Sequence, residues 1–155
     1  MVAKLPLLPH LILMNTGAVY IAKSTVDETL AASPAQGKKL LEPLKSLAAL
    51  AGAPLNIIEL DHHANVPEAH KYLDDLWYCI EGEVRFFVGG AMIEPHTRIA
   101  PDGTLDEAEM RAERIEGGKE IVLNPGDWLW IPAGEPHQHN TEKTARLFII
   151  KIPHY

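Results

Sequence analysis

The chain has 155 residues, 46% of them hydrophobic, and its 21 acidic and 14 basic side chains give a formal net charge of −7. This length fits one domain with a core of its own, because domains of about 100 to 150 residues are the commonest size. An acidic chain without a basic block cannot neutralise a run of phosphates, so nucleic acid is excluded as an expected partner.

Residues 1–54 are predicted to form an N-terminal arm that packs on the rest of the domain. Short apolar runs at 11–14 and 19–22 stand among turn-prone residues and predict a pair of strands or extended arms. No apolar run reaches the roughly 18 residues that cross a bilayer, so no membrane partner is expected. Over 34–51, leucines recur at helical spacing and predict one helix on the outside of the body, which Pro43 opens or kinks.

Residues 55–155 are predicted to form an all-β barrel within the same single domain. Short β-rich runs alternate with Gly, Pro and Asn turns, at 56–60, 76–80, 84–88, 120–123, 128–131 and 146–152. This pattern is typical of an antiparallel barrel or sandwich. One segment differs, because Gly103 and Thr104 begin a capping-box pattern and good helix formers follow. It predicts a short inserted helix or lid over 104–114.

A histidine follows a Gly and Pro turn in the run GDWLWIPAGEPHQHN, which begins at Gly126. Its spacing resembles the second sequence motif of the cupin superfamily: G, five residues, P, one residue, G, two residues, H, three residues, N. Every fixed position through His137 matches. Thr141 stands where the motif has its closing Asn, and Asn140 falls one place early.

The run PEAHKYLDDLWYCIEG, which ends at Gly82, resembles the first cupin motif in altered form. The family pattern is HxH, three or four residues, E, six residues, G. Aligned on Gly82, Asp75 takes the glutamate position, His70 the second histidine, and Glu68 replaces the first. The resemblance implies Glu68, His70, Asp75 and His137 as metal ligands, and side chains two apart on a strand share a face.

Several of these assignments have alternatives. Asp75 is one methylene shorter than Glu, so it can orient a ligating histidine instead, and Asp74 replaces it if the loop shifts by one residue. His139 can share the inward face of His137 as a reserve ligand or a proton acceptor. His62 and His63 precede the first motif and are either a solvated turn or a substrate contact.

The resemblance covers residues 55–152 and implies a double-stranded β-helix, or jelly-roll, barrel. It also implies one divalent metal ion, Fe, Mn, Ni or Zn, with Fe favoured by the carboxylate-rich set. The leading hypothesis is a metal-dependent enzyme acting on a small organic molecule, and a non-haem Fe(II) dioxygenase is the first interpretation. The alternatives are a metal-dependent isomerase or lyase, with Glu68 or His139 as the catalytic base, and a noncatalytic small-ligand-binding cupin.

Two further residues are predicted to bind substrate. Arg85 can hold a carboxylate with two hydrogen bonds if it points inward, although a surface arginine is the alternative. Trp77 either packs in the core or shapes an apolar pocket. The lone Cys79 cannot form an internal disulfide, and the apolar start lacks a charged leader and a cleavage site, which predicts a cytoplasmic protein. The resemblance also implies a homodimer.

Overall fold

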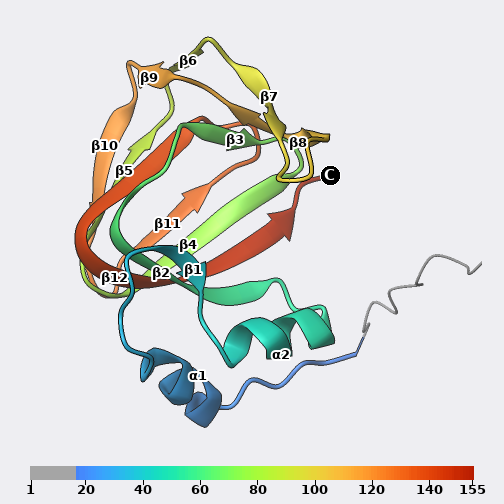
Figure 1. Ribbon diagram of the computed structural model, residues 1–155, viewed down its shortest axis with the longest axis vertical. Coiled ribbons are helices and arrows are strands. Elements are labelled where there is room, and N and C mark those ends of the chain that lie inside the picture. The colour runs from blue at the N-terminus through green and yellow to red at the C-terminus, as the bar shows by residue number, and fades with distance from the viewer. Residues whose placement is uncertain (1–16) are drawn as a thin grey trace, which may run out of the picture.

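The computed structural model describes residues 17–155, which form an antiparallel β-barrel with two helices packed below it (Figure 1). In chain order, the elements are α1 (Lys23–Leu30), β1 (Gly37–Leu40), α2 (Leu44–Ala51), β2 (Leu55–Ala64), β3 (Glu68–His70), β4 (Leu73–Glu81), β5 (Val84–Val88), β6 (Ala91–Ile93), β7 (His96–Ile99), β8 (Leu105–Arg111), β9 (Arg114–Glu116), β10 (Lys119–Leu123), β11 (Trp128–Ile131) and β12 (His137–Pro153). Among the described residues, no helix is long and apolar enough to cross a membrane.

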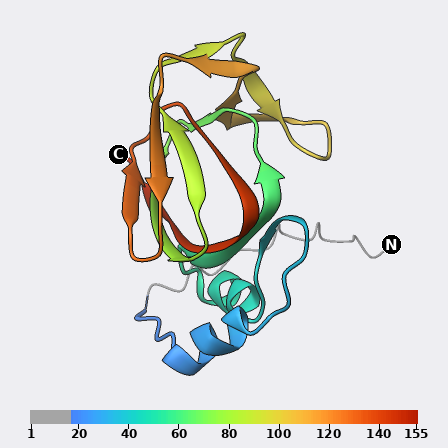
Figure 2. The ribbon, with the colours of Figure 1, turned by 90° about the vertical axis from the view of Figure 1, so that its left-hand side faces the viewer.

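The long strand β12 joins the two halves of the barrel. Its N-terminal part pairs with β5 and β3, and β10 and β8 extend that half on either side. Its C-terminal part lies between β2 and β4, which pair in turn with β1 and β11. A register shift between Thr141 and Thr144 separates the two parts. β6 and β9 form a small sheet at the end of the barrel opposite the helices (Figure 2).

Successive side chains of each central strand point alternately into the barrel interior and towards its outer face. On β2, Ile58 and Leu60 belong to the interior core, whereas Ile57 packs outside against the helices. On β4, Trp77 and Cys79 point inward. A period of two is what a strand with one face in a core requires, so the predicted strands 56–60 and 76–80 form as expected.

A buried ion pair lies between the N-terminal segment and the outer face of the barrel. Glu59 on β2 and Arg146 on β12 are directly opposite each other, with Nε 2.8 Å from Oε2. The guanidinium also donates to the carbonyl of Leu30, the last residue of α1, and to the carbonyl of Ala32, just beyond the helix. The backbone N–H of Ala35 donates to Glu59 at 3.0 Å. These bonds fasten the loop after α1 to the barrel.

Three predicted elements differ from the structure. The segment 104–114 is not a helix or lid: residues Leu105–Arg111 form strand β8, which pairs with β3 and β7. The predicted strand at 19–22 is extended chain that leads into α1, and the run at 11–14 lies outside the described residues. The helix predicted over 34–51 is confined to α2, because Gly37–Leu40 pairs with β2 and Pro43 stands at the N-cap of the helix.

Candidate metal centre

Two strands and the start of a third bring the predicted ligands to one place inside the barrel. Glu68 and His70 lie two residues apart on β3, and Asp75 lies on β4. His137 is the first residue of β12 and stands directly opposite Glu68 in the β3–β12 pair. Residues opposite each other on paired strands share a face, so both side chains point into the barrel.

The four side chains converge. One ligand atom from each of Glu68, His70 and His137 lies within 4.8 Å of the others. Glu68 Oε1 is 3.6 Å from His137 Nε2 and 4.0 Å from His70 Nε2. Asp75 Oδ2 is 3.4 Å from His70 Nε2 and 3.7 Å from His137 Nε2. The structure thus places all four predicted ligands side by side, while metal ligation itself stays a prediction.

The hydrogen bonding of His137 suits a metal ligand. Its Nδ1 lies 3.0 Å from the carbonyl oxygen of Glu135 and can only donate there, so Nε2 of the neutral ring carries the lone pair. Nε2 is buried and has no hydrogen-bond partner among the described residues, and the same holds for Asp75 Oδ2. Buried acceptors without a partner are costly unless a cation or a proton lies between them. The donor set therefore fits a divalent metal ion.

Glu68 is held as a carboxylate. Burial alone raises the pKa of its carboxyl group, but the His137 ring when it is protonated, together with the charge of Lys38, outweighs burial and holds that pKa well below its usual range. An ionised oxygen donor is what a hard or borderline metal ion requires. Glu68 is thus in the protonation state that ligation needs.

Lys151 on β12 is a neighbour that the sequence did not predict. Its Nζ lies 2.6 Å from Asp75 Oδ1 and 3.1 Å from His70 Nε2. Lys151 stands directly opposite Asp75 in the β4–β12 pair and has the inward parity of Leu147 and Ile149. That parity is the signal that could have placed it. Because the ammonium holds one oxygen of Asp75, this carboxylate is better placed to orient His70 than to be a full ligand.

A cavity of about 590 Å³ opens beside the cluster. Glu68 and His70 line it together with an apolar wall that includes Ile58, Trp77 and Ile149. A concave, mostly apolar site with a few converging polar groups is the usual form of a small-molecule site. Trp77 thus lines the cavity and is also packed edge-on against Phe86 at 5.3 Å in the core, and its contact with a substrate stays a prediction.

His139 lies behind the cluster rather than in the cavity wall. It is fully buried among aromatic rings, with the Trp77 ring 5.5 Å and the Phe86 ring 5.4 Å away. Burial, followed by the charge of Lys38, lowers the pKa of its imidazole to about 3. The ring is therefore neutral near pH 7. The catalytic role predicted for His139 has no support from this position and stays a prediction.

Three of the alternative residues lie away from the cluster. Asp74 Oδ1 accepts hydrogen bonds from the Ala133 N–H at 2.7 Å and from the His154 ring at 2.9 Å. His62 is bonded to Asp61 and has a left-handed backbone. Its neighbour His63 faces His139, with ring centroids 6.3 Å apart. Of Asp74 and Asp75, it is thus Asp75 whose carboxylate lies beside the candidate metal centre.

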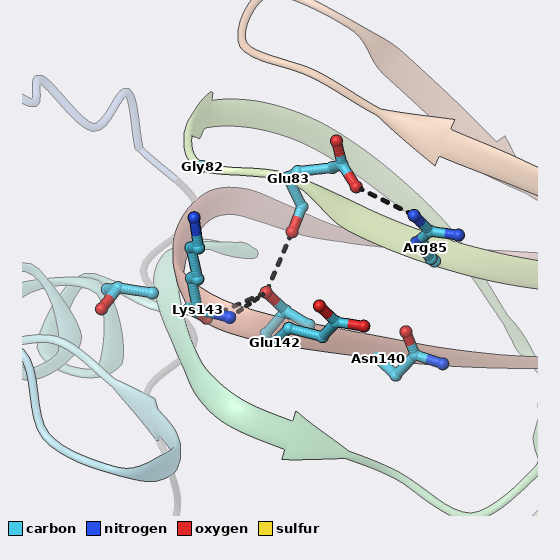
Figure 3. A pocket seen from close by; sticks show the side chains of 8 residues that line it. Gly82, Glu83, Arg85, Asn140, Glu142 and Lys143 are labelled. Atoms are coloured by element: carbon cyan, nitrogen blue, oxygen red, sulfur yellow. Dashed lines mark hydrogen bonds and ion pairs between the residues drawn. The ribbon is translucent and has the colours of Figure 1, made fainter.

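Arg85 does not point into the barrel, so the surface alternative holds and the substrate contact predicted for an inward guanidinium does not form. It is exposed on the outer face of β5, where its guanidinium lies 3.6 Å from each of Glu83 and Glu120. A separate pocket of about 360 Å³ contains Arg85 and Glu83 (Figure 3). Val122, opposite Arg85 on β10, has the same outward parity. Arg85 therefore cannot hold a substrate at the cluster.

Cys79 also has no role at the cluster. Its thiol is buried in the core and donates weakly to the carbonyls of Glu81 and Gly82. Burial raises the pKa of this thiol to about 11, so almost none of it is thiolate near neutral pH. Cys79 thus behaves as a small hydrophobic side chain of the core.

No protein-family model and no curated protein matches the sequence. Among solved structures, ycfD of E. coli is similar at 21% identity and a TM-score of 0.52, covering 78% of this chain and 35% of that chain. The cupin domain of Drosophila melanogaster CENP-C is 16% identical with a TM-score of 0.44, and the match covers 64% of this chain and 60% of that chain. The polyketide cyclase RemF from Streptomyces resistomycificus is 20% identical with a TM-score of 0.44, and the match covers 75% of this chain and 63% of that chain.

This chain thus spans less than two thirds of the length of each of these structures. Its barrel, with histidines and carboxylates converging inside, defines a jelly-roll protein with a candidate metal centre. The likeness to ycfD extends to the fold alone, and the described residues form a jelly-roll β-barrel.

Proposed function

We propose that this protein is a metal-dependent enzyme that acts on a small organic molecule in the cavity beside Glu68, His70 and His137. The observation that carries the proposal is the convergence of one carboxylate and two imidazoles within 4.8 Å. Two histidines and one carboxylate on one side of an ion are typical of non-haem Fe(II) oxygenases and leave coordination positions open. This favours a dioxygenase reaction over an isomerase or lyase reaction.

A divalent metal ion held by these three side chains supplies Lewis-acid polarisation of a substrate oxygen or, as Fe(II), the capacity to bind O2. The chain's own residues provide the rest of the site. The Glu135 carbonyl fixes the His137 tautomer, and Asp75 lies beside both imidazoles, where it can orient them. Trp77 and its apolar neighbours exclude water from the cavity side of the cluster, which strengthens electrostatic interactions there.

The first test is elemental analysis of the purified protein after anaerobic reconstitution with Fe(II) or Mn(II). We expect about one equivalent per chain in the wild type and less than a tenth of that in His137→Ala, because loss of one of three ligands abolishes tight binding. His96→Ala is the matched control, since His96 is exposed on β7. It should retain the metal.

Addition of nitric oxide to the Fe(II) protein tests whether the bound metal ion has open coordination positions. A spectroscopic change on mixing indicates such positions, which both O2 binding and binding of a substrate oxygen require. Fe(II) that is bound but does not react with nitric oxide would contradict both reaction classes. No metal in the reconstituted wild type would leave the noncatalytic ligand-binding cupin as the better interpretation.

A further inference from the structure

The cavity beside the cluster is rich in cationic side chains, although the chain as a whole is acidic. Of the described residues that line it, three are carboxylates, and five are lysines or arginines: Lys38, Lys39, Arg98, Arg111 and Lys151. These cations come from β1, β7, β8 and β12, so they surround the cavity rather than follow one strand. A divalent metal ion at the cluster would add further positive charge.

Four of the five cations already have a carboxylate partner. Lys39 lies 3.4 Å from Glu59, and Lys151 is bonded to Asp75. The Arg98 guanidinium lies 2.8 Å from Asp106, and the Arg111 guanidinium lies 2.8 Å from Glu109. Their charges are therefore largely balanced within the protein.

Lys38 is different, because it forms no hydrogen bond or ion pair with any described residue. On β1 it stands opposite Leu60, and Leu40 stands opposite Ile58. Leu60 and Ile58 both belong to the barrel interior, so the Lys38 side chain leaves the strand on the inward face. Its charge also acts on Glu68 across the cavity.

We infer that the cavity binds a small organic carboxylate, with Lys38 holding the carboxylate group and the apolar wall of Trp77, Ile58 and Ile149 holding its hydrocarbon part. This inference rests on the proposed function for the other end of the ligand, which would face the metal ion. One unpaired ammonium matches one negative charge. The apolar wall disfavours a ligand that is polar throughout, such as a sugar or a free phosphate ion.

The test compares 3-phenylpropionate with its neutral analogue 3-phenylpropanamide, and propionate and mandelate with their amides. Binding to Mn(II)-loaded protein is measured by titration calorimetry, for the wild type and for Lys38→Met. Lys143→Met is the matched control, because it removes the same charge from a lysine that lines the separate pocket. Metal content is measured in parallel for all three proteins.

We expect at least one of these acids to bind more tightly than its amide. Lys38→Met should weaken binding of that acid by about tenfold, because a charge-assisted hydrogen bond is lost. The amide affinity and the metal content should stay unchanged, and Lys143→Met should behave as the wild type.

Three outcomes would overturn the inference: no acid binds, the amides bind as tightly as the acids, or Lys38→Met binds the acids as the wild type does. With metal present, each of these leaves the proposed function intact. If the wild type holds no metal, the proposed function fails, and the same titrations on the metal-free protein still decide the role of Lys38.

Discussion

At the scale of single residues, Lys151 occupies the side of His70 that a metal ion would use. Its ammonium lies 3.1 Å from His70 Nε2 and 2.6 Å from Asp75 Oδ1. Two unit charges 4 Å apart interact by about 4 kcal/mol at an effective dielectric constant of 20, so a nearby ammonium opposes a dication. The metal-free site is therefore held together by a cation that metal binding must move.

We predict that Lys151→Met binds Mn(II) at least about tenfold more tightly than the wild type, because the competing ammonium is gone. The metal-free variant should be less stable, because the buried Asp75 loses its partner. Competition with a metal chelator measures the affinity, and Lys143→Met controls for the change in net charge. Weaker metal binding in Lys151→Met would instead mean that Lys151 organises the site.

The four predicted ligand positions could be placed because the resemblance to two motifs of fixed spacing implies them, and strand alternation puts Glu68 and His70 on one face. Parity with Leu147 and Ile149 could have put Lys151 on the inward face, but the contacts of Lys151 and Lys38 depend on strand pairing that no motif in the sequence indicates. The face of Arg85 stayed open because it depends on the register of β5, which the sequence alone does not supply.

At the scale of elements, the Glu59–Arg146 pair links the loop after α1 to the barrel. Burial raises the pKa of Glu59, but the Ala35 N–H and Arg146 outweigh burial and hold it below its ordinary value of 4.5. A carboxyl group with a lowered pKa in the folded state contributes stability above its unfolded pKa. That contribution is lost as the pH falls below about 4.5.

We predict that Glu59→Gln is about 3 kcal/mol less stable than the wild type near pH 7, because Arg146 is left buried without its partner. The difference should be constant down to about pH 4.5 and narrow below it, since Gln does not titrate. Urea unfolding at several pH values measures this. A difference that stays constant to pH 3.5 would contradict the lowered pKa.

Gly82, at the turn between β4 and β5, is a glycine whose replacement should be costly. Its φ is +82°, and an added Cβ would overlap the Thr144 carbonyl oxygen and the backbone of Ala145. Gly103 has a similar φ of +86° but open space around it.

We predict that Gly82→Ala lowers the unfolding free energy by more than about 3 kcal/mol, because steric overlap adds to backbone strain. Gly103→Ala should cost about 1 kcal/mol, since only the strain applies. Thermal and urea unfolding of both variants measure the difference. Equal effects would show that β12 moves away from the turn without cost.

The barrel strands were predictable because alternation, turn residues and a buried face all indicate the same structure. The segment 104–114 was not, because its residues favour a helix locally while β3 and β7 offer edges to pair with. Tertiary pairing thus overrides local propensity there.

At the scale of the whole molecule, metal binding should stabilise the fold, because Glu68 and His70 lie far from His137 in the sequence and the unfolded chain has no preformed site. We predict that Mn(II) at 100 times its dissociation constant adds about 2.7 kcal/mol, which raises the melting temperature by about 5 to 10 °C. His137→Ala should show no shift, and His96→Ala should shift as the wild type does. A shift in His137→Ala would place the metal elsewhere.

The homodimer that the resemblance implies stays a prediction, which light scattering can test. Trp128 and Trp130 lie on the outer face of β11 and are 60% and 63% exposed. Within the described residues, β11 pairs with β4 alone, so it is an edge strand. An exposed aromatic edge is a feature that assembly can cover.

The central place of β12 bears on how the protein is made. Every other described strand precedes β12 in the chain, yet both halves of the barrel need it as their middle strand. A nascent chain that has left the ribosome only as far as β11 therefore exposes incomplete sheet edges and lacks His137. Folding must wait for contacts of long sequence separation, which are slow to form. The cell would thus load metal only after synthesis has passed β12.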